Sequence, residues 1–199
     1  MDKSLLDLEG RLEFIGLGSQ ESASIRVLRD VVDRELPRGL EKFYAKLRAT
    51  AEVRRYFTSE EQINRATGAQ IAHWASIRDG QFDEAYMQKV RTVGLTHARI
   101  GLAPRWYIGG YALIFEHLIH AVLTDAVVAQ RSWGFRRNDV GQVVSGIGAL
   151  MKAVLLDIDV AISVYLDAAE EARLKGEAEV RHKEQRLVAG SIGSGLSAL

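Results

Sequence analysis

The stretch THARIGLAPRWYIGGY, residues 96–111, joins two apolar segments through a Gly-Leu-Ala-Pro break. Gly101 can adopt the left-handed conformation that ends many helices. Pro104 suits the first turn of a new helix, where its missing N–H costs nothing. The stretch therefore predicts one helix that ends near residue 100 and a second that runs from Pro104 to about residue 130.

His97 lies on the same side of the first helix as Val90, Val93 and Ile100, so its ring should point into the core. A buried imidazole needs a partner. From these residues alone, that partner is either a metal or a backbone carbonyl.

The other four histidines make weaker candidates for a metal ligand. His182 lies in a charged segment, and His73, beside Trp74, fits an interior or rim histidine with a structural role. His117 and His120 lack the paired Glu-x-x-His pattern of a di-iron bundle, although Glu116 is nearby.

Composition limits the kinds of protein that this chain can be. Its 199 residues are 47% hydrophobic, enough for one globular core with extensions. Lys and Arg number 26, as do Asp and Glu, so no net charge attracts nucleic acid or an acidic membrane. The absence of cysteine excludes disulfides, thiolate metal sites and haem attached through sulfur. We expect a cytoplasmic protein, because we find neither a signal peptide nor a run of roughly 18 apolar residues.

Helical periodicity and only two prolines predict an all-α fold. One helix should cover 19–36, and Pro37 should open the next. Ser59, followed by Gln62 in a capping box, should begin a helix that ends at the Asp-Gly pair 79–80, and Asp83 should cap another.

The last predicted helix begins at Asn138 or Asp139 and carries an apolar stripe as far as Leu166. Glycines inside it suggest close approach of another backbone. We expect this helix and 104–130 to pair with their copies in a second subunit, forming a dimer through a four-helix bundle. Residues 171–199 should be a charged helical linker and a frayed tail that leads toward an output domain.

Three segments together resemble the haem-binding globin domain of globin-coupled sensors. They are HARIGLAPRWYIGGY from His97, HWASIRDGQFDEAY from His73, and the Phe-Tyr pair at 43 and 44. The resemblance covers about residues 20–170. It implies a sensor globin fold over 19–170, preceded by an N-terminal extension over 1–18 and followed by the long C-terminal helix.

The resemblance also implies the site. His97 would be the proximal iron ligand of a b-type haem (iron protoporphyrin IX), with its second ring nitrogen bonded to a carbonyl or hydroxyl. Tyr44 would be the distal residue that donates a hydrogen bond to oxygen. Thr67 could supply a second distal hydroxyl, although Ala69 falls nearer that position. The expected distal pocket consists of Phe43, Tyr44, Thr67, Ala69, Gln70 and Ile71, and the expected proximal pocket of Ile100, Leu102, Trp106 and Tyr107.

In function, the resemblance implies a haem-based sensor of oxygen, or of carbon monoxide or nitric oxide, that regulates a C-terminal signalling output. The final helix resembles the junction of methyl-accepting chemotaxis transducers, which favours aerotaxis. No Ser-His-Asp arrangement or phosphate-binding loop points to an enzyme. Two alternatives remain open: a haem-free helical dimerisation or stress-sensing interaction module, and a haem enzyme such as a dioxygenase.

Overall fold

The computed structural model describes residues 8–130 and 137–196, and within these ranges every regular element is an α-helix. The prediction of an all-α fold is therefore confirmed. The helices are α1 (Leu8–Ile15), α2 (Ser19–Arg26), α3 (Arg29–Ala49), α4 (Ala51–Arg54), α5 (Glu60–Arg78), α6 (Glu84–Ile100), α7 (Pro104–Gln130) and α8 (Arg137–Leu196).

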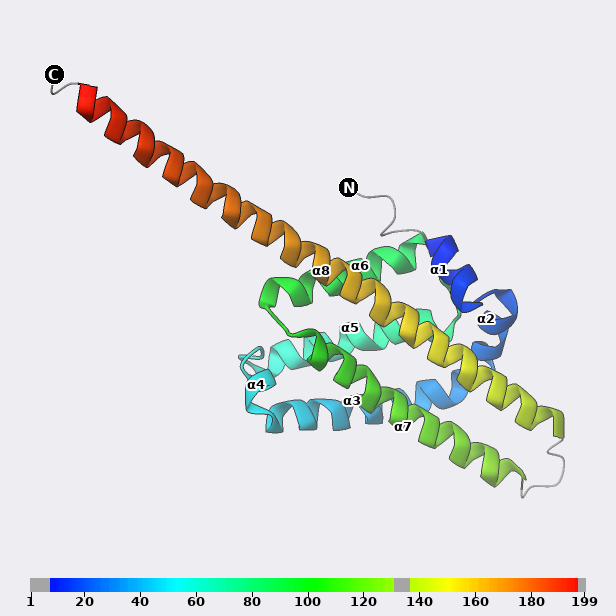
Figure 1. Cartoon of the computed structure of the whole chain (residues 1–199). Helices are drawn as coiled ribbons and strands as arrows, with labels where there is room; N and C mark the ends of the chain where they lie inside the picture. The colour runs from blue at the N-terminus through cyan, green and yellow to red at the C-terminus, as the bar shows by residue number, and fades with distance from the viewer. Residues whose placement is uncertain (1–7, 131–136, 197–199) are drawn as a thin grey trace.

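The first half of α8 lies against most of the other helices (Figure 1). It packs along α6, α2 and α7, and α3 packs on the other side of α7. Trp74, Ile77 and Leu118 are among the side chains that fill the space between these helices. A second, smaller apolar cluster around Tyr44 and Leu47 lies beside α4. The fold therefore holds α3, α5, α6 and α7 in place around the site described below.

Local chemistry sets most helix ends as the sequence predicts. The Ser59 hydroxyl accepts a hydrogen bond from the backbone N–H of Gln62 at 3.3 Å, and the Asp83 carboxylate accepts one from that of Tyr86 at 2.9 Å. Gly101 ends α6 with φ +69°, in the left-handed region. The predicted starts and ends of α5, α6 and α7 are confirmed.

The predicted helix start at Pro37 is wrong, because Pro37 lies inside α3. Its side chain is exposed, so water can satisfy the carbonyl that proline leaves without an N–H partner. The break falls at 27–28 instead, where Leu28 turns into the core. There α8 comes very close: a Cβ on Gly146 would lie 2.8 Å from the Ser24 carbonyl oxygen. We expected another backbone to lie close to a glycine of this helix. At Gly146 the backbone of α2, in the same chain, does so.

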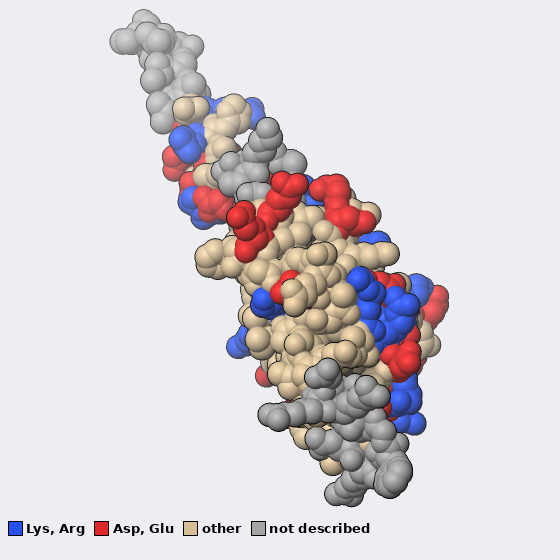
Figure 2. All heavy atoms as spheres, turned by 90° about the vertical axis from the view of Figure 1, so that its right-hand side faces the viewer, with Lys and Arg blue, Asp and Glu red and all other residues tan. Residues whose placement is uncertain are grey.

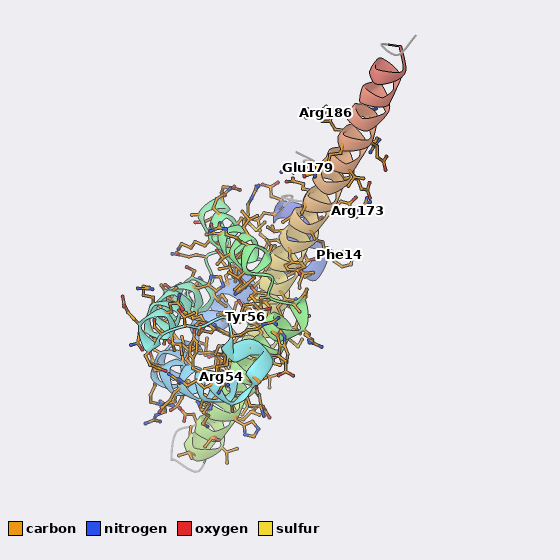
Figure 3. The ribbon with its side chains drawn as sticks, turned by 90° about the vertical axis from the view of Figure 1, so that its left-hand side faces the viewer. Phe14, Arg54, Tyr56, Arg173, Glu179 and Arg186 are labelled. Carbon is orange, nitrogen blue, oxygen red and sulfur yellow. The ribbon has the colours of Figure 1, made fainter. Side chains whose placement is uncertain are left out.

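The second half of α8 extends beyond the rest of the molecule (Figures 1 and 3). Arg173, Glu179 and Arg186 point outward from it in Figure 3. Arg173 donates to Glu170 at 2.6 Å, one helical turn away, and also bonds Glu177. The backbone stays helical to Leu196, whereas we expected a frayed tail. The division into 1–18, 19–170 and 171–199 stays a prediction.

By length and composition alone, Pro104–Ala129 of α7 is apolar enough to cross a membrane, which our sequence analysis did not foresee. One face of this helix packs into the core through Tyr111, Ile114, Leu118 and Val122. Its opposite face includes exposed apolar side chains, among them Leu123 and Val127. The apolar character of α7 therefore comes from two faces, of which the folded chain buries one.

Candidate functional site

A largely apolar cavity of about 680 Å³ lies among α3, α5, α6 and α7. This volume is within the range of sites for small molecules and cofactors. α3 contributes Phe43 and Tyr44, α5 contributes Gln70 and His73, and α6 contributes His97. The remaining lining is mainly apolar and aromatic: Leu47, Val53, Phe57, Trp74, Val93, Ile100, Leu102, Trp106, Tyr107, Tyr111, Leu113 and Ile114.

His97 lines this cavity from the last turn of α6. Burial lowers the pKa of its imidazole, which keeps the ring neutral and able to donate a lone pair to a metal. Its Nδ1 atom is buried and bonds no residue in the described part of the chain. We expected a carbonyl or hydroxyl there. The ring packs instead against Tyr107, with centroids 4.9 Å apart and planes tilted by 59°.

Tyr44 reaches the same cavity from α3, and only 4% of its surface is exposed. Its ring meets Phe43 edge-on at 4.9 Å and Phe57 at 6.1 Å. Burial raises the pKa of the Tyr44 hydroxyl, and hydrogen bonding with Thr67 partly offsets this. The phenol is therefore neutral at ordinary pH and can donate a hydrogen bond into the cavity.

The structure brings most of the predicted site residues to this cavity, namely Phe43, Tyr44, Ala69, Gln70, His97, Ile100, Leu102, Trp106 and Tyr107. Thr67 does not line it: its hydroxyl donates to the Ile63 carbonyl at 2.9 Å and reaches the site only through Tyr44. Ile71 also lies outside the lining and is 40% exposed. Gln70 has a buried Oε1 atom that no described residue bonds, which leaves an acceptor at the cavity wall.

Tyr56, labelled in Figure 3, lies just after α4 and lines part of the cavity. Its hydroxyl donates to the carbonyl of Gly101 at 2.8 Å, and the Arg55 guanidinium lies 5.0 Å from the centre of its ring. This bond links the segment after α4 to the end of the helix that carries His97. No pattern in the sequence marks Tyr56 as a site residue.

A buried carboxylate, Asp157 of α8, also escaped the sequence analysis. It accepts hydrogen bonds from Tyr86, Tyr107 and Tyr111 and pairs with His73 at 2.8 Å. Burial, and then the charge of Asp157, raise the pKa of each of these three phenols well above its usual value. The only hint in the sequence is that two carboxylates, Asp157 and Asp159, interrupt an apolar stripe, and nothing in it says which of them is buried.

Within the described residues, no group of three or more His, Cys, Asp or Glu side chains could hold a metal ion. The neutral imidazole of His97 in a largely apolar cavity suits a metal that would arrive with most of its own ligands. A haem fits this lining, since its iron could bind one imidazole and its ring could pack against apolar walls. The absence of cysteine limits its attachment to coordination and packing.

Residues 5–171 match the Protoglobin family. The chain belongs to the Protoglobin family. It is 24% identical over 194 residues to the heme-based aerotactic transducer HemAT of Halobacterium salinarum, a match that covers 97% of this chain. The chain spans 39% of the length of that transducer.

Two solved globin domains share the fold of this Protoglobin chain. One belongs to a globin-coupled sensor of Geobacter sulfurreducens, with a TM-score of 0.65 and 13% identity over 79% of this chain and 96% of the other. The other is the ferric globin domain of DosC of E. coli, with a TM-score of 0.55 and 18% identity over 73% and 95%. The predicted sensor globin fold is therefore confirmed.

Proposed function

We propose that this chain binds a b-type haem and senses oxygen, with His97 as the proximal iron ligand and Tyr44 as the distal hydrogen-bond donor. One observation carries the proposal: a neutral imidazole and a buried phenol reach the same apolar cavity in a chain of the Protoglobin family. The relation to a heme-based aerotactic transducer supports it.

Each residue would have a distinct physical role. When bound, haem supplies an iron that takes up oxygen, carbon monoxide or nitric oxide reversibly. His97 would hold that iron through a lone pair that burial keeps free of a proton. Tyr44 would favour oxygen over carbon monoxide, because its hydroxyl would donate a hydrogen bond into the cavity and oxygen would be the better acceptor of the two ligands. The apolar walls of the cavity would exclude water from the imidazole of His97 and the hydroxyl of Tyr44.

A homodimer through α7 and α8 is the second part of the proposal. Val144, Met151, Leu155 and Leu166 recur along one side of α8, and all four are between 46% and 62% exposed. Figure 2 looks onto the side of the molecule where α7 and α8 run together, and few charged side chains occupy its middle. Pairing of this face with its copy would bury apolar side chains that the single chain leaves in water.

Signal output is the third part. The charged second half of α8 projects away from the globin body, and the HemAT relative is much longer than this chain. We infer that α8 carries a change in the haem pocket to a C-terminal output domain, most simply in aerotaxis and in the cytoplasm. The chain itself would catalyse no reaction.

Visible spectroscopy tests the haem site. The purified chain, supplied with hemin, should bind about one haem per chain and give the spectrum of histidine-ligated haem. His97→Ala should lose that spectrum, whereas His182→Ala, on the projecting part of α8, should keep it. Failure of the wild-type chain to bind haem would favour the haem-free interaction module. Rapid oxygen consumption with a reductant would favour a haem enzyme.

A further inference from the structure

The carboxylate of Asp157 joins α8 to three other helices. Its Oδ1 atom accepts a hydrogen bond from the Tyr86 hydroxyl of α6 at 2.8 Å and lies 2.8 Å from Nε2 of His73 on α5. Its Oδ2 atom accepts a hydrogen bond from the Tyr107 hydroxyl at 3.0 Å and another from Tyr111, both of α7. The three phenols thus use three of the roughly four acceptor sites of an ionised carboxylate, and His73 lies beside it at ion-pair distance.

A carboxylate at a core position costs free energy, because burial removes it from water. Asp157 has no exposed surface, and none of the four groups that bond it is a Lys or Arg side chain. Leu156 and Val160, its neighbours in the core, fill the same kind of space with apolar atoms. Removal of a charge from water is costly unless every site is bonded. Three phenol donors on one buried carboxylate indicate that this position serves orientation as well as packing.

Three of the four groups bonded to Asp157 also line the cavity: His73, Tyr107 and Tyr111. The Tyr107 ring lies 4.9 Å from the His97 ring, between centroids. A single side chain therefore stands between the carboxylate of α8 and the proposed iron ligand.

α6 and α8 also touch directly at this level. A Cβ on Gly94, three residues before His97, would lie 2.8 Å from the Ala161 carbonyl oxygen and 3.1 Å from Val164. Ala161 is one helical turn after Asp157. The helix that carries His97 therefore meets α8 at two levels, through the bond of Tyr86 to Asp157 and through the close approach of Gly94 to Ala161.

We propose that Asp157 is a positioning residue, which fixes the Tyr107 ring beside His97 and carries a displacement of His97 into α8. This inference rests on the proposed haem function for its signalling role. The positioning role concerns the chain's own residues and holds without haem.

The ferrous iron–histidine stretching frequency, measured by resonance Raman spectroscopy on the haem-loaded protein, tests the positioning role. Asp157→Asn replaces one acceptor oxygen with an NH2 group that carries two donors, and should shift this frequency. Tyr107→Phe, which removes the hydroxyl and keeps the ring, should also shift it. The double variant should shift it no further than the larger single change, because both act through one contact. Asp159→Asn, two residues along α8 and exposed, should leave it unchanged.

Hydrogen exchange tests the coupling to α8. In the wild-type protein, exchange over residues 150–165 should differ between the ligand-free and carbon monoxide-bound states. Asp157→Asn should abolish that difference and Asp159→Asn should keep it. Coupling between sites has to be measured in this way, since proximity alone does not establish it.

The outcomes separate this inference from the proposed function. A folded Asp157→Asn protein with the wild-type stretching frequency would overturn it, as would additive shifts in the double variant. If Asp157→Asn does not fold, an unchanged frequency in Tyr107→Phe would overturn it equally.

If the wild-type chain binds no haem, the proposed function fails. The haem-free proteins then decide the positioning role: the near-ultraviolet circular dichroism of the tyrosines should weaken in Asp157→Asn but not in Asp159→Asn, and an unchanged signal in Asp157→Asn would overturn the inference.

Discussion

The imidazole of His97 and the phenol ring of Tyr107 lie 4.9 Å apart between centroids, tilted by 59°, inside one apolar cavity. Contacts of this kind contribute about 0.5–1.5 kcal/mol beyond the area that they bury. If His97 holds haem, Tyr107→Leu should speed haem release about 2- to 10-fold, a range that follows from this energy. Transfer of haem to an excess of apomyoglobin measures the rate. Tyr107→Phe keeps the ring and should accelerate release less than Tyr107→Leu; equal acceleration in both variants would contradict the role of the ring.

Tyr44 should control oxygen release. A hydrogen bond to a charged partner contributes about 1.5–3 kcal/mol, so Tyr44→Phe should raise the oxygen dissociation rate about 10- to 150-fold. Carbon monoxide release should change much less. Stopped-flow or flash-photolysis measurements give both rates. Tyr56→Phe is the matched control, because Tyr56 lines the same cavity but its hydroxyl donates to the Gly101 carbonyl. Similar effects of the two substitutions would remove Tyr44 from this role.

Close contact between α6 and α8 leaves no room for a side chain at Gly94. A Cβ would lie 2.8 Å from a backbone oxygen of α8, and neither helix can yield cheaply. Gly94→Ala should lower the free energy of unfolding by about 1–3 kcal/mol, as overpacked cores do. Gly68→Ala, at an exposed position of α5 with nothing within 4 Å, should raise it by up to about 1 kcal/mol. Urea denaturation of both variants measures the difference, and a neutral Gly94→Ala would contradict this packing.

Helix ends could be predicted from the sequence because their causes are local. Ser59 and Asp83 cap the helices that follow them. Gly101 adopts the left-handed conformation that ends α6, and Pro104 fits the first turn of α7. The start assigned to Pro37 failed for the opposite reason. Whether a proline interrupts a helix depends on what surrounds its turn, and here the turn faces solvent.

The site residues fall into two similar groups, those that a local motif marks and those that only contacts between distant segments define. His97 and the residues near it could be proposed from one short motif, and Tyr44 from a Phe-Tyr pair. The Asp157 cluster could not, because its bonds join residues 46, 50 and 71 positions apart in the chain. No local pattern marks a carboxylate whose partners come from three other helices. Thr67 likewise acts on the cavity only through its contact with Tyr44.

Alkaline titration should reveal the three phenols that bond Asp157. The pKa of Tyr86, Tyr107 and Tyr111 is raised well above its usual value, first by burial and then by the nearby carboxylate. Their contribution to stability is thus complete below the ordinary tyrosine pKa of about 10 and is lost as pH rises beyond it toward the raised values. Three of the six tyrosines should stay protonated until the chain unfolds, as followed by tyrosinate absorbance and circular dichroism. Smooth ionisation of all six before unfolding would contradict the buried cluster.

Substitution of Leu155 by a charged residue should disrupt the proposed dimer. It is 54% exposed on the apolar side of α8, where the proposed dimer would bury it. Leu155→Glu would place one carboxylate from each subunit in or near that interface, and burial of unpaired like charges is strongly unfavourable. The variant should sediment as a monomer at concentrations where the wild-type chain is a dimer. Ile71→Glu, also at an exposed apolar position but on α5, should leave the dimer intact. Analytical ultracentrifugation distinguishes the cases: a monomeric wild-type chain, or a Leu155→Glu dimer of wild-type affinity, would rule out this face as the interface.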